Sequence, residues 1–156
     1  MRTMKLSQQS SYATAGYLKK FNTLEEVKKY LGADPVLSRF GCIVRIKDGR
    51  TKKRIILDLK QSKVTSGTRK RWRVMLPRLV DLIADIVDMS CDLADDEDIA
   101  VMVLDFVDAF WNIPLAFGER RFFVGKVRGI LYVYTRSAQG SRNAPLSWAA
   151  VIALVE

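Results

Sequence analysis

Helical periodicity occurs in three stretches of the chain. Thr23-Leu24-Glu25-Glu26 fits a capping box and begins an apolar stripe, so we predict a short helix that ends at Gly32. Pro77 precedes a second predicted helix, in which apolar residues recur at Leu79, Leu82, Ile83, Ile86 and Val87. Pro145 opens a third apolar stretch, to Val155, that also favours a helix.

Two stretches are typical of β-hairpins. In residues 40–59, two β-branched runs are joined by Asp48-Gly49, a pair that favours a tight turn between antiparallel strands. Residues 122–135 repeat this pattern about Arg128-Gly129. Strands and helices therefore both occur in the chain, and the fold class predicted is α/β (α+β).

The remaining stretches are polar. The first 20 residues contain few apolar side chains and are predicted to be a loosely ordered extension. Residues 60–73 are crowded with cations and predict an exposed connection, and residues 92–98 predict an acidic loop. With no internal repeat and no interdomain linker, the 156 residues are enough for one compact domain.

The charge of the chain is divided between its halves. Residues 1–78 hold 20 Lys and Arg against 5 Asp and Glu, a net charge of +15, while residues 79–156 hold 6 against 12, a net charge of −6. A surface this basic suits a polyanion, either a nucleic acid or an anionic membrane. A basic protein with no such partner is nearly as well supported by composition alone.

Histidine is absent and there are two cysteines, Cys42 and Cys91. This composition excludes a histidine-based catalytic triad and a zinc site made of four Cys or His ligands. Both thiols are predicted to be small buried apolar groups in a reducing compartment. The amino-terminal residues lack the apolar core of a secretory signal, so an intracellular location is expected.

One apolar run ends on an acidic residue. Residues 99–104 are apolar without alternation, which predicts a strand buried on both faces, and Asp105 follows at its end. A carboxylate held rigidly at the rim of a sheet is what a Mg²⁺ (or Mn²⁺) site requires. An alternative interpretation is structural: Asp108 caps the turn that begins at Ala109, and Phe110 is a core aromatic.

The stretch VLDFVDAFWNIPL resembles the first catalytic motif of reverse transcriptases of retrotransposons and retrovirus-like elements. The resemblance implies that Asp105 is the catalytic residue and binds both metal ions. It implies that the backbone at Asp108 and Ala109 lines the incoming triphosphate. It also implies that Phe110 packs where a ribose 2′-hydroxyl would lie and so excludes ribonucleotides.

Two further stretches match motifs of the same family. SAQGSRNAPL resembles its Gln-Gly motif, which implies that Gln139 contacts the nucleotide and that Gly140 and Pro145 begin a helix supporting the template. KKRIILDLK resembles the strand of the fingers, which implies that Arg54 reaches the triphosphate and that Lys52 or Lys53 assists it. An alternative for the lysines is a solvated strand edge that discourages aggregation.

The three motifs occur in the family's order and span residues 40–150. Their joint match implies the right-hand polymerase fold, with fingers over about 21–75 and a partial palm over about 76–156. The resemblance further implies an antiparallel sheet with helices on one face. The expected activity of the complete protein is RNA-directed DNA polymerisation by two-metal nucleotidyl transfer.

The family's Tyr-x-Asp-Asp motif, which supplies the remaining metal ligands, does not occur in this sequence and is expected beyond Glu156. We therefore expect the chain alone to be inactive and to self-associate through its partial palm. The expected partners are an RNA or DNA template-primer and deoxynucleoside triphosphates, with no membrane. The nucleic-acid contacts are expected at Lys52, Lys53, Arg69, Lys70, Arg71, Trp72, Arg73, Gly140 and Pro145. The alternative is a catalytically dead, nucleic-acid-binding remnant of a mobile element.

Overall fold

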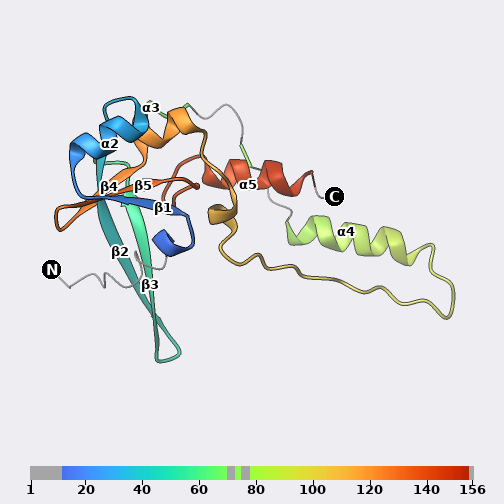
Figure 1. Cartoon of the computed structure of the whole chain (residues 1–156). Helices are drawn as coiled ribbons and strands as arrows, with labels where there is room; N and C mark the ends of the chain where they lie inside the picture. Colours follow the sequence, from blue (N-terminus) through green and yellow to red (C-terminus); the bar gives the residue numbers. More distant parts are fainter. Residues whose placement is uncertain (1–11, 70–72, 75–77, 155–156) are drawn as a thin grey trace. The chain divides into compact units, whose positions relative to one another are not determined.

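The computed structural model describes residues 12–69, 73–74 and 78–154 (Figure 1). The chain divides into two compact units. Unit 1 comprises Met1–Trp72 and Asp108–Glu156, and unit 2 comprises Arg73–Val107. Unit 2 is thus inserted in the sequence of unit 1. The expected boundary between fingers and palm near residue 75 remains a prediction.

Unit 1 is a mixed α/β structure built on an open five-stranded sheet in the order β1-β5-β4-β2-β3. The strands are β1 (Leu18–Phe21), β2 (Leu37–Lys47), β3 (Arg50–Asp58), β4 (Val124–Val127) and β5 (Ile130–Tyr134). All neighbouring strands are antiparallel except β2 and β4, which are parallel. The expectation of an antiparallel sheet is therefore wrong at this one pairing, which joins strands from distant parts of the chain.

Both predicted hairpins are confirmed. In the turn between β2 and β3, Asp48 and Gly49 have φ angles of 52° and 69°. In the turn between β4 and β5, Arg128 and Gly129 have φ angles of 48° and 83°. Two consecutive residues at positive φ give the turn geometry that matches the right-handed twist of the flanking strands. These short turns fix the register of each hairpin.

Helix α2 (Leu24–Leu31) begins and ends where the sequence predicts. The Thr23 hydroxyl accepts a hydrogen bond from the Glu26 amide at 3.2 Å. The Glu26 carboxylate accepts one from the Thr23 amide at 3.4 Å, which completes the capping box. Gly32 ends the helix with a φ of 64°, in the left-handed region that glycine adopts most readily.

The core lies on both faces of the sheet. On one face, Val27 and Leu31 of α2 pack in a cluster with Val124, Leu131 and Val133. On the other face, Tyr132 and Tyr134 lie in a second cluster with buried residues that include Trp111 of the 3₁₀ helix η1 (Ala109–Asn112). Helical segments therefore cover both faces, and the expectation of helices on one face only is wrong.

Unit 1 also contains shorter helical segments and a carboxyl-terminal helix. They are α3 (Val64–Gly67), η2 (Phe117–Phe122) and α5 (Ala144–Ile152). The helix predicted after Pro145 is confirmed, since Pro145 lies in the first turn of α5, where its missing amide hydrogen leaves no helical bond unmade.

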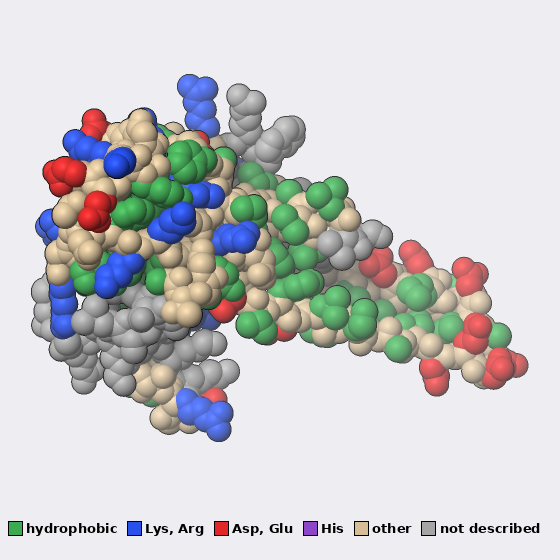
Figure 2. Space-filling view, viewed as in Figure 1, with side chains coloured by type: hydrophobic (Ala, Val, Ile, Leu, Met, Phe, Trp, Pro, Cys, Tyr) green, Lys and Arg blue, Asp and Glu red, His purple; other side chains and the backbone are tan. Residues whose placement is uncertain are grey.

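Unit 2 contains the predicted second helix, α4 (Leu79–Ser90). Arg78 precedes it and donates backbone and side-chain hydrogen bonds to the Asp81 carboxylate, which lower the pKa of that carboxyl. None of the residues of α4 is buried. On the face shown in Figure 2, acidic side chains gather over α4 and the loop after it, with apolar side chains exposed among them.

The strand predicted over residues 99–104 is absent from the described structure. These residues have no regular secondary structure, and Met102 and Val103 are 79% and 86% exposed. No described strand pairs with this segment, so its backbone has no ladder to join. A run of apolar residues specifies burial only where a partner is present to cover it. The prediction that Asp105 lies at the rim of a sheet is therefore also wrong for the described structure.

The prediction that both cysteines are buried is wrong, because Cys42 and Cys91 are exposed. Cys42 lies where β2 no longer pairs with β4 and pairs only with β3, at the start of the outer part of the β2–β3 hairpin. Cys91 is the carboxyl-terminal cap of α4, a helix that buries no residue.

Candidate functional site

The Gln-Gly motif lies on the outer edge of β3. The Leu57 amide donates a hydrogen bond to the Gln139 carbonyl oxygen at 3.3 Å. Gly140 has a φ of +102°, and a Cβ there would lie 3.0 Å from the Leu57 carbonyl oxygen. Only glycine combines this φ with so close an approach. Two of the sequence motifs, 82 residues apart at Leu57 and Gln139, are thus joined by their backbones.

The segment after the Asp-Ala-Phe motif is held against the same region. The Ser137 amide donates to the Ile113 carbonyl oxygen at 2.8 Å, and the Leu115 amide donates to the Thr135 carbonyl oxygen at 2.9 Å. Pro114 and Arg136 form an isolated antiparallel bridge between these bonds. Parts of all three motifs therefore meet in unit 1.

Asp108 and Ala109 form the start of η1. Asp108 has a φ of 53°, and its carbonyl oxygen accepts a hydrogen bond from the Trp111 amide at 2.7 Å. Asp108 is at the cap position of this turn, as the structural alternative predicted. Its carboxylate makes no capping hydrogen bond, so the predicted capping interaction is absent. Ala109 and Phe110 are half-buried, while Trp111 is 2% exposed. The fully buried aromatic of this motif is therefore Trp111.

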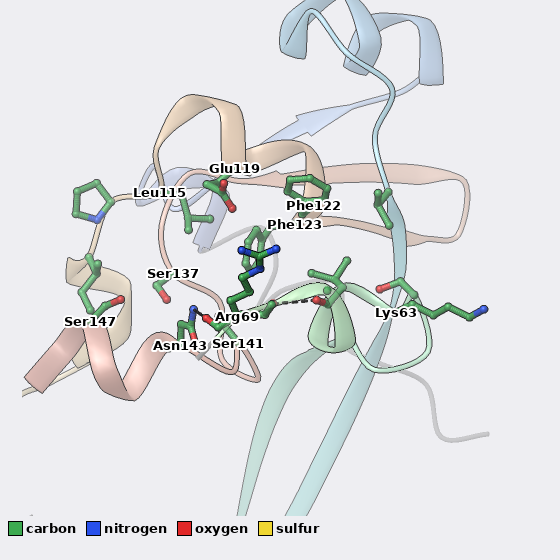
Figure 3. Close-up of a pocket in the computed structure, with 18 residues that line it drawn as sticks. Lys63, Arg69, Leu115, Glu119, Phe122, Phe123, Ser137, Ser141, Asn143 and Ser147 are labelled. Atoms are coloured by element: carbon green, nitrogen blue, oxygen red, sulfur yellow. Dashed lines mark hydrogen bonds between the residues drawn. The ribbon is translucent and has the colours of Figure 1, made fainter. Parts of the chain in front are cut away.

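A cavity of about 600 Å³ lies beside this junction (Figure 3). Its lining comes from the connection after β3, the segment after η1, the region of η2, and the segment from the Gln-Gly motif into α5. Hydroxyl and amide groups, two cations and one carboxylate line it, at Ser62, Thr68, Ser137, Ser141, Ser147, Asn143, Lys63, Arg69 and Glu119. The lining therefore offers several neutral hydrogen-bonding groups, and its two cations outnumber its one carboxylate.

Hydrogen bonds from Arg142 and Asn143 connect two of the segments around the cavity. The Arg142 guanidinium donates to the carbonyl oxygens of Thr65 and Thr68, at 3.4 Å each. The Asn143 amide donates to the Arg69 carbonyl oxygen at 3.4 Å, and Figure 3 draws Arg69 and Asn143 side by side at one end of the cavity. The Asn143 Oδ1 atom is buried and has no hydrogen-bond partner among the described residues. A buried acceptor of this kind is costly unless a ligand or water donates to it.

Arg69 was predicted as a nucleic-acid contact, but the other residues of this hydrogen-bond network were not predicted from the sequence. Arg142 and Asn143 occupy the variable positions of the Gly-x-x-x-Ala-Pro pattern, and Thr65 and Thr68 lie in a polar connection with no periodicity. The sequence offered one indication of these residues, which is that each lies within a few positions of a predicted site residue in the chain.

The predicted basic contacts lie in different places. Arg54 is exposed and pairs with Ile43, while Lys52 and Lys53 lie in β3 opposite Arg45 and Val44. Arg69 lines the cavity, and Arg73 is exposed in unit 2. Pro145 is exposed in α5. The predicted contacts Lys70, Arg71 and Trp72 lie outside the described residues.

The predicted catalytic residue lies in the other unit of the chain. Asp105 is exposed and belongs to unit 2, whereas Asp108 belongs to unit 1. Among the residues that the structure describes, no three Asp, Glu, Cys or His side chains are grouped so that they could hold a metal ion. The described part of the chain therefore does not fit a complete Mg²⁺ site.

The division of charge follows the two units more sharply than it follows the two halves of the sequence. Unit 1 holds 24 Lys and Arg against 8 Asp and Glu, a net charge of +16. Unit 2 holds 2 against 9, a net charge of −7. The positive potential that attracts polyanions is thus a property of unit 1.

Within the described ranges, no helix combines the length and the apolar character needed to cross a membrane. No protein-family model matches the chain, and no curated protein matches it.

Proposed function

We propose that this chain is the amino-terminal part of a reverse transcriptase domain, and that in the complete protein it takes part in RNA-directed DNA polymerisation. The observation that carries the proposal is the junction between Leu57 and Gln139. The family resemblance assigns a triphosphate contact to Arg54 and a nucleotide contact to Gln139. Both roles require the two segments to reach the same nucleotide, and they are adjacent in unit 1.

The Asp-Ala-Phe motif adds support for the same site. Its tail is bonded through Ile113 to Ser137, two residues before Gln139. In the proposal, the backbone at Asp108 and Ala109 binds the triphosphate, and Phe110 excludes a 2′-hydroxyl. These residues position the nucleotide, which is the larger share of the protein's work in phosphoryl transfer.

In the proposal, Asp105 is the one residue of this chain that would bind Mg²⁺. A divalent ion bound there would neutralise charge on the transferred phosphates when further carboxylates complete its coordination. The described residues do not supply those carboxylates, so we assign no step of the reaction to them.

The test is primer extension on an RNA template by this chain joined to a palm hairpin with Tyr-x-Asp-Asp and a thumb domain. Deoxynucleotide incorporation is expected, with Asp105→Asn abolishing it and Arg54→Ala raising KM for the nucleotide. Asp92→Asn, a matched change in the acidic loop, should leave extension intact. Extension that survives Asp105→Asn would refute the assignment.

A second candidate is a non-catalytic nucleic-acid-binding protein derived from such a polymerase. The net charge of +16 on unit 1 favours it, because phosphate binding needs only cations and no metal site. If the extended polypeptide binds template-primer tightly but never incorporates nucleotide, this second function is the correct one.

A further inference from the structure

Strands β2 and β3 form a two-stranded ribbon beyond the rest of the sheet. β2 pairs with β4 only over Leu37–Arg39, whereas its pairing with β3 continues to Lys47 opposite Arg50. In Figure 1, the far ends of these two strands extend away from the other strands of the sheet. The outer part of the ribbon, residues 43–54, therefore lies outside the main sheet.

The register of this ribbon gathers positive charge on one face. Ile43 is opposite Arg54, Arg45 is opposite Lys52, and Lys47 is opposite Arg50. Side chains alternate between faces along a strand, so positions two apart share a face. The backbone therefore places positions 45, 47, 50, 52 and 54 on one face, and all five are Lys or Arg. We call this the cationic face of the ribbon.

The opposite face has a different character. Val44 and Ile46 lie there, 42% and 75% exposed, together with Thr51 and position 53, which is a lysine. The cationic face in turn carries one apolar residue, Ile43, which is 42% exposed. Five of the six cations between positions 42 and 55 are therefore on one face. The cationic face is thus the result of strand register, and not of a ribbon that is uniformly basic.

Like charges directly opposite each other destabilise a pair of strands. Arg45 opposite Lys52, and Lys47 opposite Arg50, are two such pairs. Asp48, in the turn, is the only acidic residue between positions 42 and 55. Arg45, Arg50 and Arg54 are exposed, and none forms an ion pair with a carboxylate in the described residues. Among the described side chains, no carboxylate offsets the charge of these three arginines, so an anion from outside the chain would reduce the repulsion between them.

We propose that the cationic face binds the phosphate backbone of a nucleic-acid strand. From position 50 to position 54 the face runs for about 14 Å, at about 3.4 Å per residue. That length matches about four nucleotides at the rise of about 3.4 Å per nucleotide along one strand. A single triphosphate would contact only part of it. A two-stranded ribbon is also one of the two elements that the major groove of DNA admits.

An anionic membrane fits this arrangement less well. Amphipathic elements bind membranes by burying their apolar face while cations beside it reach the lipid headgroups. Here most of the cations lie on one face and Val44 and Ile46 lie on the other. The turn between the strands is charged, with Asp48 in the turn and Arg50 directly after it. A flat bilayer can therefore contact only one of the two faces at a time.

This inference rests on the proposed function for the identity of the polyanion. It goes beyond that function because the family resemblance assigns no role to Arg45 or Arg50. Its test uses binding alone, without nucleotide or metal, so it can fail while primer extension by the complete polymerase succeeds.

The test is fluorescence anisotropy of the whole chain with labelled 20-nucleotide RNA and DNA single strands and a 20-base-pair duplex, over a series of salt concentrations. Replacing two phosphate contacts in Arg45→Thr/Arg50→Thr should lower the slope of log K against log salt by about 1.4 for single strands and about 1.8 for the duplex. Lys29→Gln/Arg128→Gln, an equal loss of charge elsewhere in unit 1, should change it by less than half as much. Arg45→Lys/Arg50→Lys should retain the wild-type slope, because a point charge suffices for a phosphate.

A separate readout distinguishes binding from a structural role. Arg45→Thr should raise the Tm of the free chain, because it removes a like-charge pair and adds a β-branched residue. A fall in Tm together with unchanged binding would assign these arginines to stability and overturn the proposal. Loss of binding to phosphatidylserine vesicles in Arg45→Thr/Arg50→Thr, with nucleic-acid binding unchanged, would overturn it in favour of a membrane.

Discussion

The indole ring of Trp111 is stacked on the phenol ring of Tyr134, with ring centroids 5.6 Å apart and planes inclined by only 9°. Tyr12 and Tyr17 stack on the same indole, at 4.7 Å and 5.2 Å. This cluster attaches η1, with its Asp-Ala-Phe motif, to the sheet. Aromatic packing of Trp111 therefore positions the backbone at Ala109, two residues earlier in the chain.

Removing the indole should destabilise unit 1 strongly. Trp111 is 2% exposed, and deletion of so large a buried side chain typically costs about 3–5 kcal/mol of unfolding free energy. Urea unfolding of Trp111→Ala, followed by far-ultraviolet circular dichroism, measures this. The control Ile46→Ala changes a side chain that is 75% exposed, and its effect should stay within about 0.5 kcal/mol. Equal effects of the two changes would contradict the packing described for η1.

Tyr134 should make unit 1 sensitive to alkali. Burial raises the pKa of Tyr134 above its ordinary value of 10.0. Below pH 10 the phenol is protonated in both states, and its contribution to stability is fully present. Above pH 10 the unfolded chain releases this proton first, so stability falls by about 1.4 kcal/mol per pH unit until the folded phenol ionises.

The comparison that isolates this group is Tyr134→Phe. The difference in unfolding free energy between wild type and Tyr134→Phe should be constant below pH 10 and should then change in favour of the variant. A constant difference up to pH 11.5 would mean that the phenol is not shielded from solvent.

Gly140 should tolerate no side chain. Its φ of +102° and the 3.0 Å approach of a Cβ to the Leu57 carbonyl oxygen predict that Gly140→Ala costs about 1–3 kcal/mol. Gly118→Ala is the matched control, because a Cβ at Gly118 meets nothing within 4 Å. In the complete polymerase, Gly140→Ala should also raise KM for the nucleotide, since it displaces Gln139 from β3. Thermal unfolding and steady-state kinetics measure the two effects, and a neutral Gly140→Ala would contradict both.

Helix α4 should promote self-association of the chain. Its apolar residues Leu79, Ile83 and Val87 are 73%, 50% and 55% exposed, and exposed apolar patches associate. Ile83→Lys/Val87→Lys should shift the protein toward the monomer in size-exclusion chromatography with light scattering. Asp85→Asn/Asp88→Asn, on the same helix, makes the same change of +2 in net charge and controls for it. Equal elution of all three proteins as monomers would show that this apolar surface does not associate.

Local features of the fold were predictable because neighbouring residues determine them. The capping box at Thr23 and the two turns at Asp48-Gly49 and Arg128-Gly129 each depend on backbone bonds within a few residues, and all three are confirmed.

Features that depend on distant partners were not predictable. No sequence pattern in Leu37–Arg39 or in Val124–Lys126 predicts that these two segments pair in parallel. Residues 99–104 have the composition of a buried strand, yet burial requires a neighbour that the described structure does not supply. Apart from Arg69, the polar residues that line the cavity were also not predicted, because Thr68 and Asn143 act through a backbone carbonyl and a side-chain amide that follow no sequence pattern. The roles assigned to Arg54, Phe110, Gln139 and Asp105 remain predictions.

The insertion of unit 2 into unit 1 has a consequence for the order in which the chain folds. The β2–β3 hairpin closes a two-residue loop and can form within microseconds. β1 and β2 have a different requirement, because their neighbours β5 and β4 lie about 100 residues further along the chain. During synthesis at about 5–20 residues per second, β1 and β2 therefore wait several seconds with open edges. The pairings β1–β5 and β2–β4, which join the two hairpins and β1 into one sheet, are both non-local. Non-local pairing slows the folding of unit 1, and the open strand edges of the nascent chain are prone to aggregation until β5 emerges.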